Sequence, residues 1–213
     1  MTAANREGVI KFQLDFADGP APAAELLIEL NEWRAVFRKH GLLGQDPQRY
    51  EGYGYGNLSR RLPGQDGDVF LITGTQTGHL QALRPEDYAT VLECDPVTNH
   101  LKAIGQIKPS SEALSHGALY QCDPDILWVM HLHSPDIFRQ RIRLNLPCTQ
   151  SDADYGTPEM AAEILKLAQC GNRNGPGLLV MAGHQDGILA YGCSAQTTGK
   201  RVIDTLTRAL QTR

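Results

Sequence analysis

The sequence has 213 residues, of which 41% are hydrophobic and 21% charged, and its 20 basic and 24 acidic side chains give a formal net charge of -4. This length and apolar content favour one globular domain and exclude a disordered chain, a collagen, a coiled coil and a disulfide-rich miniprotein. A mildly acidic chain has no overall electrostatic attraction for nucleic acid or an anionic membrane, so neither is expected as a partner.

Cysteine usage and the start of the chain predict a cytoplasmic protein. The five cysteines are odd in number and widely spaced, and no CxxC motif occurs, as is typical of a reducing compartment. The first residues contain no apolar run of signal-peptide length, and the longest apolar runs, such as 126–130, are too short to span a bilayer.

The first half of the chain predicts several strands and one helix. Alternating apolar residues predict a strand over 10–16, and apolar positions at helical spacing predict a helix over 23–40. A Gly/Tyr-rich passage at 50–56 follows, whose glycines let the backbone approach another group closely. Further strands are expected over 57–62, 69–73, 88–93 and 101–104.

Helices and strands alternate in the second half. Helices are predicted over 110–121, from Ser134-Pro135, from Thr157-Pro158 to about 170, and around an inner stripe of Val202, Ile203, Leu206 and Leu210. Strands are predicted over 126–133, 178–181 and 188–191, with a loop at 171–177. The predicted fold class is α/β: a single domain over 1–213, with residues 1–20 as an N-terminal strand extension and a largely antiparallel sheet flanked by helices.

The sharpest local feature is His131-Leu132-His133 at the end of a predicted buried strand. Side chains at i and i+2 of a strand point to one face, so both imidazoles can converge, and His184 also follows an apolar strand. Three neutral imidazoles with one open position are typical of catalytic zinc sites. Histidines at strand ends with ordinary hydrogen bonds explain the same spacing. The remaining histidines, at 40, 79, 100 and 116, are interpreted as surface or packing residues.

A second feature is Lys108-Pro109-Ser110-Ser111-Glu112, which opens a predicted helix. Hydroxyls and free N–H groups at a helix N-terminus form an anion or phosphate site, although plain capping accounts for the same residues. Residues 56–59 and 73–78 offer further glycines, hydroxyls and an amide near strand ends. Neither stretch matches a Walker loop or a dinucleotide fingerprint, and ordinary turns explain both.

In their order along the chain, GN-x-S, T-x-T-G, PSSE, HxH and G-H-x-x-G resemble the motifs of the class II aldolase/adducin family, closest to the L-fuculose-phosphate and L-ribulose-phosphate type. The resemblance runs from about residue 26 to 210 and is most specific over 108–135. It implies an α/β/α sandwich, a homotetramer, and a lyase of carbohydrate metabolism. The implied reaction cleaves a small phosphorylated sugar through a metal-stabilised enediolate.

The resemblance also implies roles for the matching residues. Zn²⁺ or another divalent cation would be bound by His131, His133 and His184, with Glu112 as the general acid/base. The substrate phosphate would be held by Asn57, Thr77, Gly78, Ser110 and Ser111, with Thr75 as an alternative counterpart of Thr77.

The sequence departs from this family in three places. Its segment 144–156 is shorter than the family segment that supplies a tyrosine to a neighbouring subunit, and Tyr155 is the sole tyrosine there. The chain stops at Arg213 without the tail that supplies another active-site tyrosine, and the strand over 10–16 is additional.

Other functions fit the same family. A dehydratase of the methylthioribulose-1-phosphate type or an epimerase would use the same metal site. The PSSE motif favours an aldolase, because the dehydratase typically has alanine between the serine and the glutamate. A non-catalytic module like the adducin heads is disfavoured, because those have lost the metal ligands.

Overall fold

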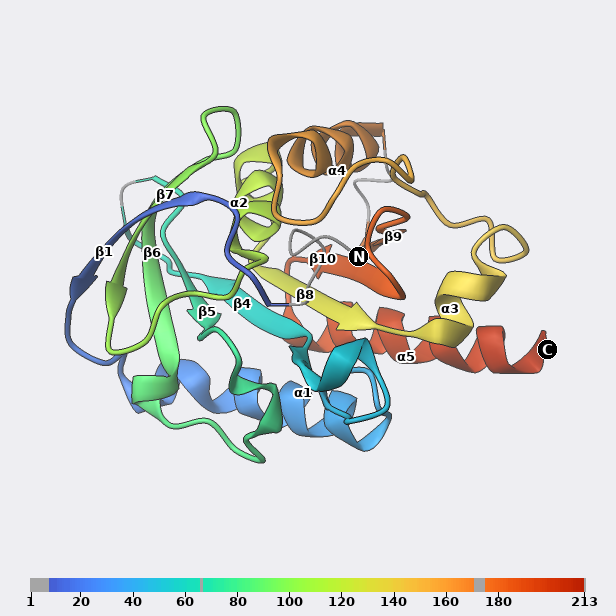
Figure 1. Ribbon diagram of the computed structural model, residues 1–213, viewed down its shortest axis with the longest axis horizontal. Coiled ribbons are helices and arrows are strands. Elements are labelled where there is room, and N and C mark those ends of the chain that lie inside the picture. Colours follow the sequence, from blue (N-terminus) through green and yellow to red (C-terminus); the bar gives the residue numbers. More distant parts are fainter. Residues whose placement is uncertain (1–7, 66, 171–174, 213) are drawn as a thin grey trace.

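An eight-stranded sheet with helices on both faces forms the protein, as the computed structural model shows for residues 8–65, 67–170 and 175–212 (Figure 1). One face is covered by α2 (Ala113–Cys122) and α4 (Pro158–Cys170). The opposite face is covered by α1 (Ile28–Lys39) and α5 (Ala195–Gln211). The predicted fold class, an α/β/α sandwich around a central sheet, is confirmed.

The sheet is antiparallel except at one edge. Its strand order is β1-β7-β6-β5-β4-β8-β10-β9, and only the β1–β7 pair of this sheet is parallel. The strands are β1 (Gln13–Asp18), β4 (Asn57–Arg61), β5 (Phe70–Thr73), β6 (Tyr88–Asp95), β7 (His100–Gly105), β8 (Trp128–His133), β9 (Gly177–Val180) and β10 (Gly187–Gly192).

Short elements complete the described chain. The strands β2 (Gly44–Gln45) and β3 (Gly54–Tyr55) form a separate two-stranded sheet, and α3 (Pro135–Gln140) follows β8. The 3-10 turns are η2 (Ala24–Leu27), η3 (Tyr50–Gly52), η4 (Thr77–His79) and η5 (Pro85–Asp87). No helix in these parts of the chain combines the length and apolar character needed to cross a membrane.

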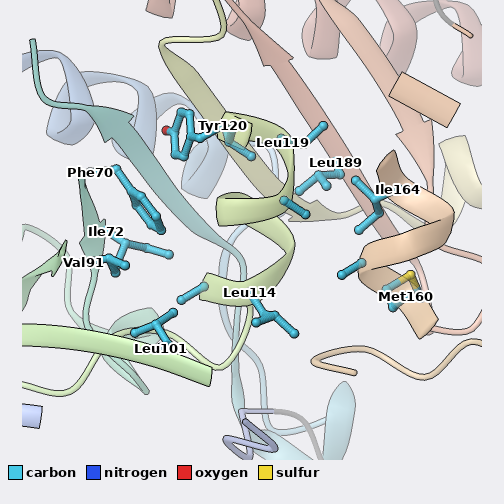
Figure 2. Close-up of a cluster of buried hydrophobic side chains, with 14 of the residues drawn as sticks. Phe70, Ile72, Val91, Leu101, Leu114, Leu119, Tyr120, Met160, Ile164 and Leu189 are labelled. Carbon is cyan, nitrogen blue, oxygen red and sulfur yellow. The ribbon is translucent and has the colours of Figure 1, made fainter. Parts of the chain in front are cut away.

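Alternation along β8 decides which side chains reach the site. Trp128, Met130 and Leu132 belong to the core against α1 and α5, whereas Val129 belongs to the core against α2. His131 and His133 share the parity of Val129, so they face α2. Figure 2 shows the core on this face, where side chains of β5, α2, α4 and β10 meet: Phe70, Ile72, Leu114, Leu119, Met160, Ile164 and Leu189.

Several predicted boundaries were wrong. The strand predicted over 10–16 begins at Gln13, because pairing with β7 starts at Gln13 opposite His100, and it ends at Asp18. The helix predicted from Ser110 begins at Ala113, because the backbone N–H of Ser110 is bound to the carbonyl of Thr73 at the end of β5.

The helix predicted over 23–40 has its first turn in the 3-10 form. Leu210 was placed wrongly on the inner stripe of the last helix. It is 44% exposed, whereas Ile203 is partly buried and the buried apolar positions are Ala195, Val202, Leu206 and Ala209. Of the predicted loop at 171–177, residues 171–174 lie outside the described residues, and Gly177 begins β9.

Candidate functional site

Three histidines come together at the end of β8. The Nε2 atoms of His131 and His133 lie 3.1 Å apart, and the ring of His184 lies 5.1 Å and 4.8 Å from their rings, between centroids. His184 occupies the tight turn between β9 and β10, in which its N–H is bound to the carbonyl of Met181 and its carbonyl accepts from the N–H of Gly187. Because β10 pairs with β8, this turn is brought over the end of the His131 strand.

The chemistry of this cluster suits a divalent cation. One ligand atom from each histidine lies within 4.8 Å of the others, and all three side chains are buried. Burial lowers the pKa of His131 to about 3, and burial also lowers the pKa values of His133 and His184 well below the usual value. The imidazoles are therefore neutral at pH 7, the form in which their nitrogens bind zinc and similar ions.

Glu112 lies at the N-cap position of α2, beside the histidines. Its Oε1 atom is 3.7 Å from Nε2 of His184, and its Oε2 atom accepts a hydrogen bond from Oγ of Ser115 at 3.2 Å. Burial raises the pKa of Glu112 to about 7, against the opposing effects of Ser115 and Lys11. Such a carboxyl group exists in both protonation states near neutral pH, as a general acid/base requires.

The other five predicted site residues line one pocket. It is formed by the start of β4, the turn after β5 and the segment before α2, and its lining includes Asn57, Thr77, Gly78, Ser110 and Ser111. Thr75 lines it too, so both threonine assignments stay open. Asn57 pairs with His131 across β4 and β8, and Ser111 precedes Glu112, so the pocket adjoins the histidine cluster.

Two buried oxygen atoms of the site are unsatisfied hydrogen-bond acceptors within the described part of the chain. The Oδ1 atom of Asn57 is buried and has no hydrogen-bond partner among the described residues, and the same holds for Oε1 of Glu112. An unsatisfied buried polar atom costs free energy, and a bound ligand with hydroxyl groups would recover it.

Contacts from α1 fix the turn that carries Thr77 and Gly78. Arg34 is buried and donates to the carbonyls of Thr77 and Leu80, each at 2.7 Å, and Arg38 donates to the carbonyl of Gly78. Sequence reasoning missed both arginines, since their partners are backbone carbonyls more than 35 residues away.

Aromatic side chains enclose the histidines. The ring of Tyr50 lies 4.6 Å from that of His133, and its hydroxyl donates to Oδ2 of Asp186 in the His184 turn at 2.9 Å. On the other side, the ring of Tyr155 lies 4.6 Å from that of His184. The glycines of the Gly/Tyr-rich passage predicted that its backbone approaches another group closely, but the sequence did not show that this group is the histidine cluster.

His116, interpreted from the sequence as a surface or packing residue, is buried beside this site. Its Nδ1 atom shares a 2.7 Å hydrogen bond with Oγ of Ser59, which is also bonded to the hydroxyl of Tyr120 at 2.6 Å. Glu112, His116 and Tyr120 are spaced four residues apart, which places them on one face of α2. His116 is thus a buried packing residue with a hydrogen-bond partner, in agreement with one of the two interpretations from the sequence.

A larger cavity of about 430 Å³ lies at the opposite end of β8 and β10. Its lining includes Ile126, Leu127 and Tyr191, and none of the predicted site residues. The chemistry-bearing side chains therefore gather away from this cavity, around the histidines.

Fold and site together define an α/β protein with a buried three-histidine cluster at a strand end. Residues 46–212 match the sequence model described as Class II Aldolase and Adducin N-terminal domain, and the chain belongs to this family. A search among curated proteins finds no match.

Solved structures with the same fold include three whose descriptions name aldolase chemistry. L-fuculose-1-phosphate aldolase from Thermus thermophilus is 18% identical, with a TM-score of 0.63 over 89% of this chain and 92% of that one. YgbL from Escherichia coli, described as a putative aldolase/epimerase/decarboxylase, is 22% identical, with a TM-score of 0.61 over 88% and 87%. A sugar-phosphate aldolase from Thermotoga maritima is 14% identical, with a TM-score of 0.64 over 87% and 92%.

Proposed function

We propose that this chain is a divalent-metal-dependent lyase of the aldolase type that cleaves a small phosphorylated sugar. The observation that carries the proposal is the grouping of three neutral, buried histidines with Glu112, whose pKa is about 7, beside a pocket lined by hydroxyls. Metal binding by His131, His133 and His184 is part of the proposal, with zinc as the expected ion.

The pocket residues would bind and orient the substrate phosphate. The hydroxyls of Ser110 and Ser111 and the amide of Asn57 offer hydrogen-bond donors at the pocket wall, whereas the Thr77 hydroxyl donates to the carbonyl of Gly74 and shapes the turn. Binding energy from this remote group holds the sugar in a fixed position relative to the reacting carbons.

Glu112 would move the proton. Cleavage of the carbon–carbon bond gives two fragments. The fragment that contains the carbonyl group keeps the electron pair of the broken bond and becomes an enediolate. The other fragment loses the proton of its hydroxyl group, and its carbon becomes the carbonyl carbon of an aldehyde. The histidines would hold a divalent cation, which would supply positive charge for the oxygens on which negative charge develops. Glu112 takes up a proton as a carboxylate and delivers it to the enediolate carbon as an acid, so protons balance over the cycle.

The similar structures support this class of substrate. Two of these three proteins are named as sugar-phosphate aldolases, and YgbL carries a description that includes an epimerase. Epimerisation on the same site is therefore an alternative reaction, and dehydration is a second alternative that rests on the resemblance of the sequence motifs alone. The expected homotetramer and cytoplasmic location stay predictions.

A substrate screen tests the proposal. Purified protein is loaded with Zn²⁺, incubated with phosphorylated ketoses and their unphosphorylated counterparts, and assayed for release of dihydroxyacetone phosphate and an aldehyde. Cleavage that is lost on chelation and restored by the metal supports the aldolase. A dehydrated product without cleavage supports the dehydratase instead, and the absence of metal-dependent turnover contradicts the proposed function.

A further inference from the structure

The segment in front of β1 enters the candidate site, although it lies outside the part of the chain that the family sequence model matches. In Figure 1, residues 8–12 run from the middle of the molecule, beside α2, to the β1 edge of the sheet. Gly8 lines the pocket that contains Asn57, Thr77, Ser110 and Ser111, which is called the hydroxyl pocket below. The backbone of Gly8 lies there against the side chain of Gln76. Three residues later the same segment carries Lys11.

The backbone of Lys11 is held in place from two sides. Nδ2 of Asn99 donates to the Lys11 carbonyl at 3.1 Å, and the carbonyl of Asn99 accepts from the N–H of Gln13 at 2.8 Å. Asn99 belongs to the turn that joins β6 to β7, and β1 then continues in register with β7. The start of the Lys11 side chain is thereby fixed relative to the sheet.

The side chain of Lys11 points into the site rather than to solvent. It is 15% exposed, and Nζ lies 3.8 Å from the centroid of the Tyr155 ring, which itself packs on His184. Oδ2 of Asp154, on a side chain that is 47% exposed, lies 3.9 Å away. His184 lies in turn 3.7 Å from Glu112, between Nε2 and Oε1, so Lys11, Tyr155, His184 and Glu112 follow one another across the site.

Lys11 is also near the hydroxyl pocket. A Cβ atom added at Gly156 would lie 3.7 Å from Cβ of Lys11 and 3.3 Å from the carbonyl oxygen of Ser111. The aliphatic part of the Lys11 side chain and the carbonyl group of Ser111 therefore both lie close to Gly156. The described residues that line the pocket include no lysine or arginine, so a phosphate bound there would lack a charged partner from the lining itself.

We propose that Lys11 is a substrate-binding residue of this site, and that its ammonium group holds an anionic oxygen of the substrate next to Glu112. The inference rests on the proposed function, because it concerns the same substrate site. A charge-assisted hydrogen bond to an oxyanion is stronger than the neutral hydrogen bonds that the pocket hydroxyls offer. The segment before β1 would therefore add affinity and selectivity for charged substrates.

The test measures binding to the full-length, metal-loaded protein by isothermal titration calorimetry. The probes are dihydroxyacetone phosphate, inorganic phosphate, glycolate and neutral dihydroxyacetone. The variants are Lys11→Met, which keeps the apolar stem, Lys11→Arg, which keeps the charge, and Lys102→Met as a matched control, since Lys102 pairs with Glu93 on the surface. Metal content and circular dichroism are recorded for each.

Lys11→Met is expected to weaken binding of the anionic probes by about 10- to 100-fold, with unchanged metal content. Lys11→Arg is expected to restore most of that affinity, while Lys102→Met and the binding of neutral dihydroxyacetone stay unchanged. If Lys11 only packed on Tyr155, Lys11→Met would lower the stability of the protein. The difference in affinity between the charged and the neutral probes would then stay as in the wild type.

A second measurement needs only the wild-type chain. Acetic anhydride labelling with mass spectrometry compares Lys11 and Lys102, and a saturating anionic probe is expected to protect Lys11 alone.

The inference is overturned if Lys11→Met binds every anionic probe with the affinity of the wild type. Lys11-dependent binding of phosphate or glycolate without binding of dihydroxyacetone phosphate supports it while contradicting the sugar-phosphate substrate.

Discussion

The histidine cluster and the hydroxyl pocket adjoin each other but are built differently. Two of the three histidines are consecutive same-face positions of one buried strand, and the third follows β9, two strands along the sheet. The pocket is instead assembled from four separate segments and is shaped by turns, including Gln76 with a φ of 56°. Its position depends on contacts from α1, such as those of Arg34.

This difference separates two ways of placing a functional group. In the strand, the pleat sets side-chain direction with a period of two residues, so a short motif is enough to make two ligands converge. In the pocket, each residue depends on backbone turns and on long-range hydrogen bonds that no local motif encodes. Changes in the two regions should therefore have separable effects.

The largest effect is expected at Glu112, which lies between the two regions. Glu112→Gln keeps the size and burial of the side chain but removes the proton that it transfers, so turnover should fall by about 100- to 10,000-fold. Metal content should stay at the wild-type level. Exposed Glu159 on α4 provides the control, Glu159→Gln. Wild-type turnover in Glu112→Gln would remove this residue from the mechanism.

The second effect concerns the histidine cluster alone. His184→Ala should lower metal affinity by about 100-fold or more, because changes to groups that only support a ligand already cost about 10- to 100-fold. Metal analysis of the purified variant, with His100→Ala as a surface control, checks this. Unchanged metal content would contradict the ligand assignment.

The third effect concerns the pocket alone. A Cβ atom at Gly78 would lie 2.3 Å from the carbonyl oxygen of Gly44 and 2.7 Å from Cα of Gly54, so Gly78→Ala must displace the turn. We expect a loss of about 1–3 kcal/mol in the free energy of unfolding and weaker phosphate binding, with metal affinity kept.

Gly175→Ala is the matched control for that change, since nothing lies within 4 Å of the added atom. Urea unfolding and phosphate titration are the measurements. If Gly78→Ala lost metal and phosphate together, the two regions would not be separable.

A fourth effect is the pH dependence of the metal-free protein. Burial lowers the pKa values of His131, His133 and His184, so the unfolded chain takes up protons near pH 6.5 that the folded chain does not. Their stabilising contribution is complete above about pH 6.5 and is lost as the pH falls, by up to about 1.4 kcal/mol per pH unit for each histidine.

Glu112 acts in the opposite direction. Its pKa is raised from 4.5 to about 7, so its contribution is complete below pH 4.5 and is lost as the pH rises through 7. Three histidines outweigh one carboxyl group, and stability should fall from pH 6.5 to 5. Urea unfolding of chelator-treated protein measures this slope, which His184→Ala should reduce and Gly78→Ala should leave unchanged. An equal slope in all three proteins would contradict the burial of neutral histidines.

Sequence alone predicted the strands that carry the site, because β8 and β10 are apolar runs of strand length. It also determined that His131 and His133 face one way, since the strand period leaves no alternative. The order of the short motifs indicated the family, which the match over 46–212 shows. These features depend on local geometry or on residues close together in the chain.

Only the tertiary structure decided which distant groups complete the site. Arg34 binds carbonyls more than 40 residues away, and His116 shares a hydrogen bond with Ser59, which is 57 residues away in the sequence. Lys11 falls within the strand predicted over 10–16, yet pairing starts two residues later and leaves its side chain over Tyr155. Such contacts depend on how strands order in the sheet and how turns fold back, which are properties of the whole packed chain rather than of any short stretch of it.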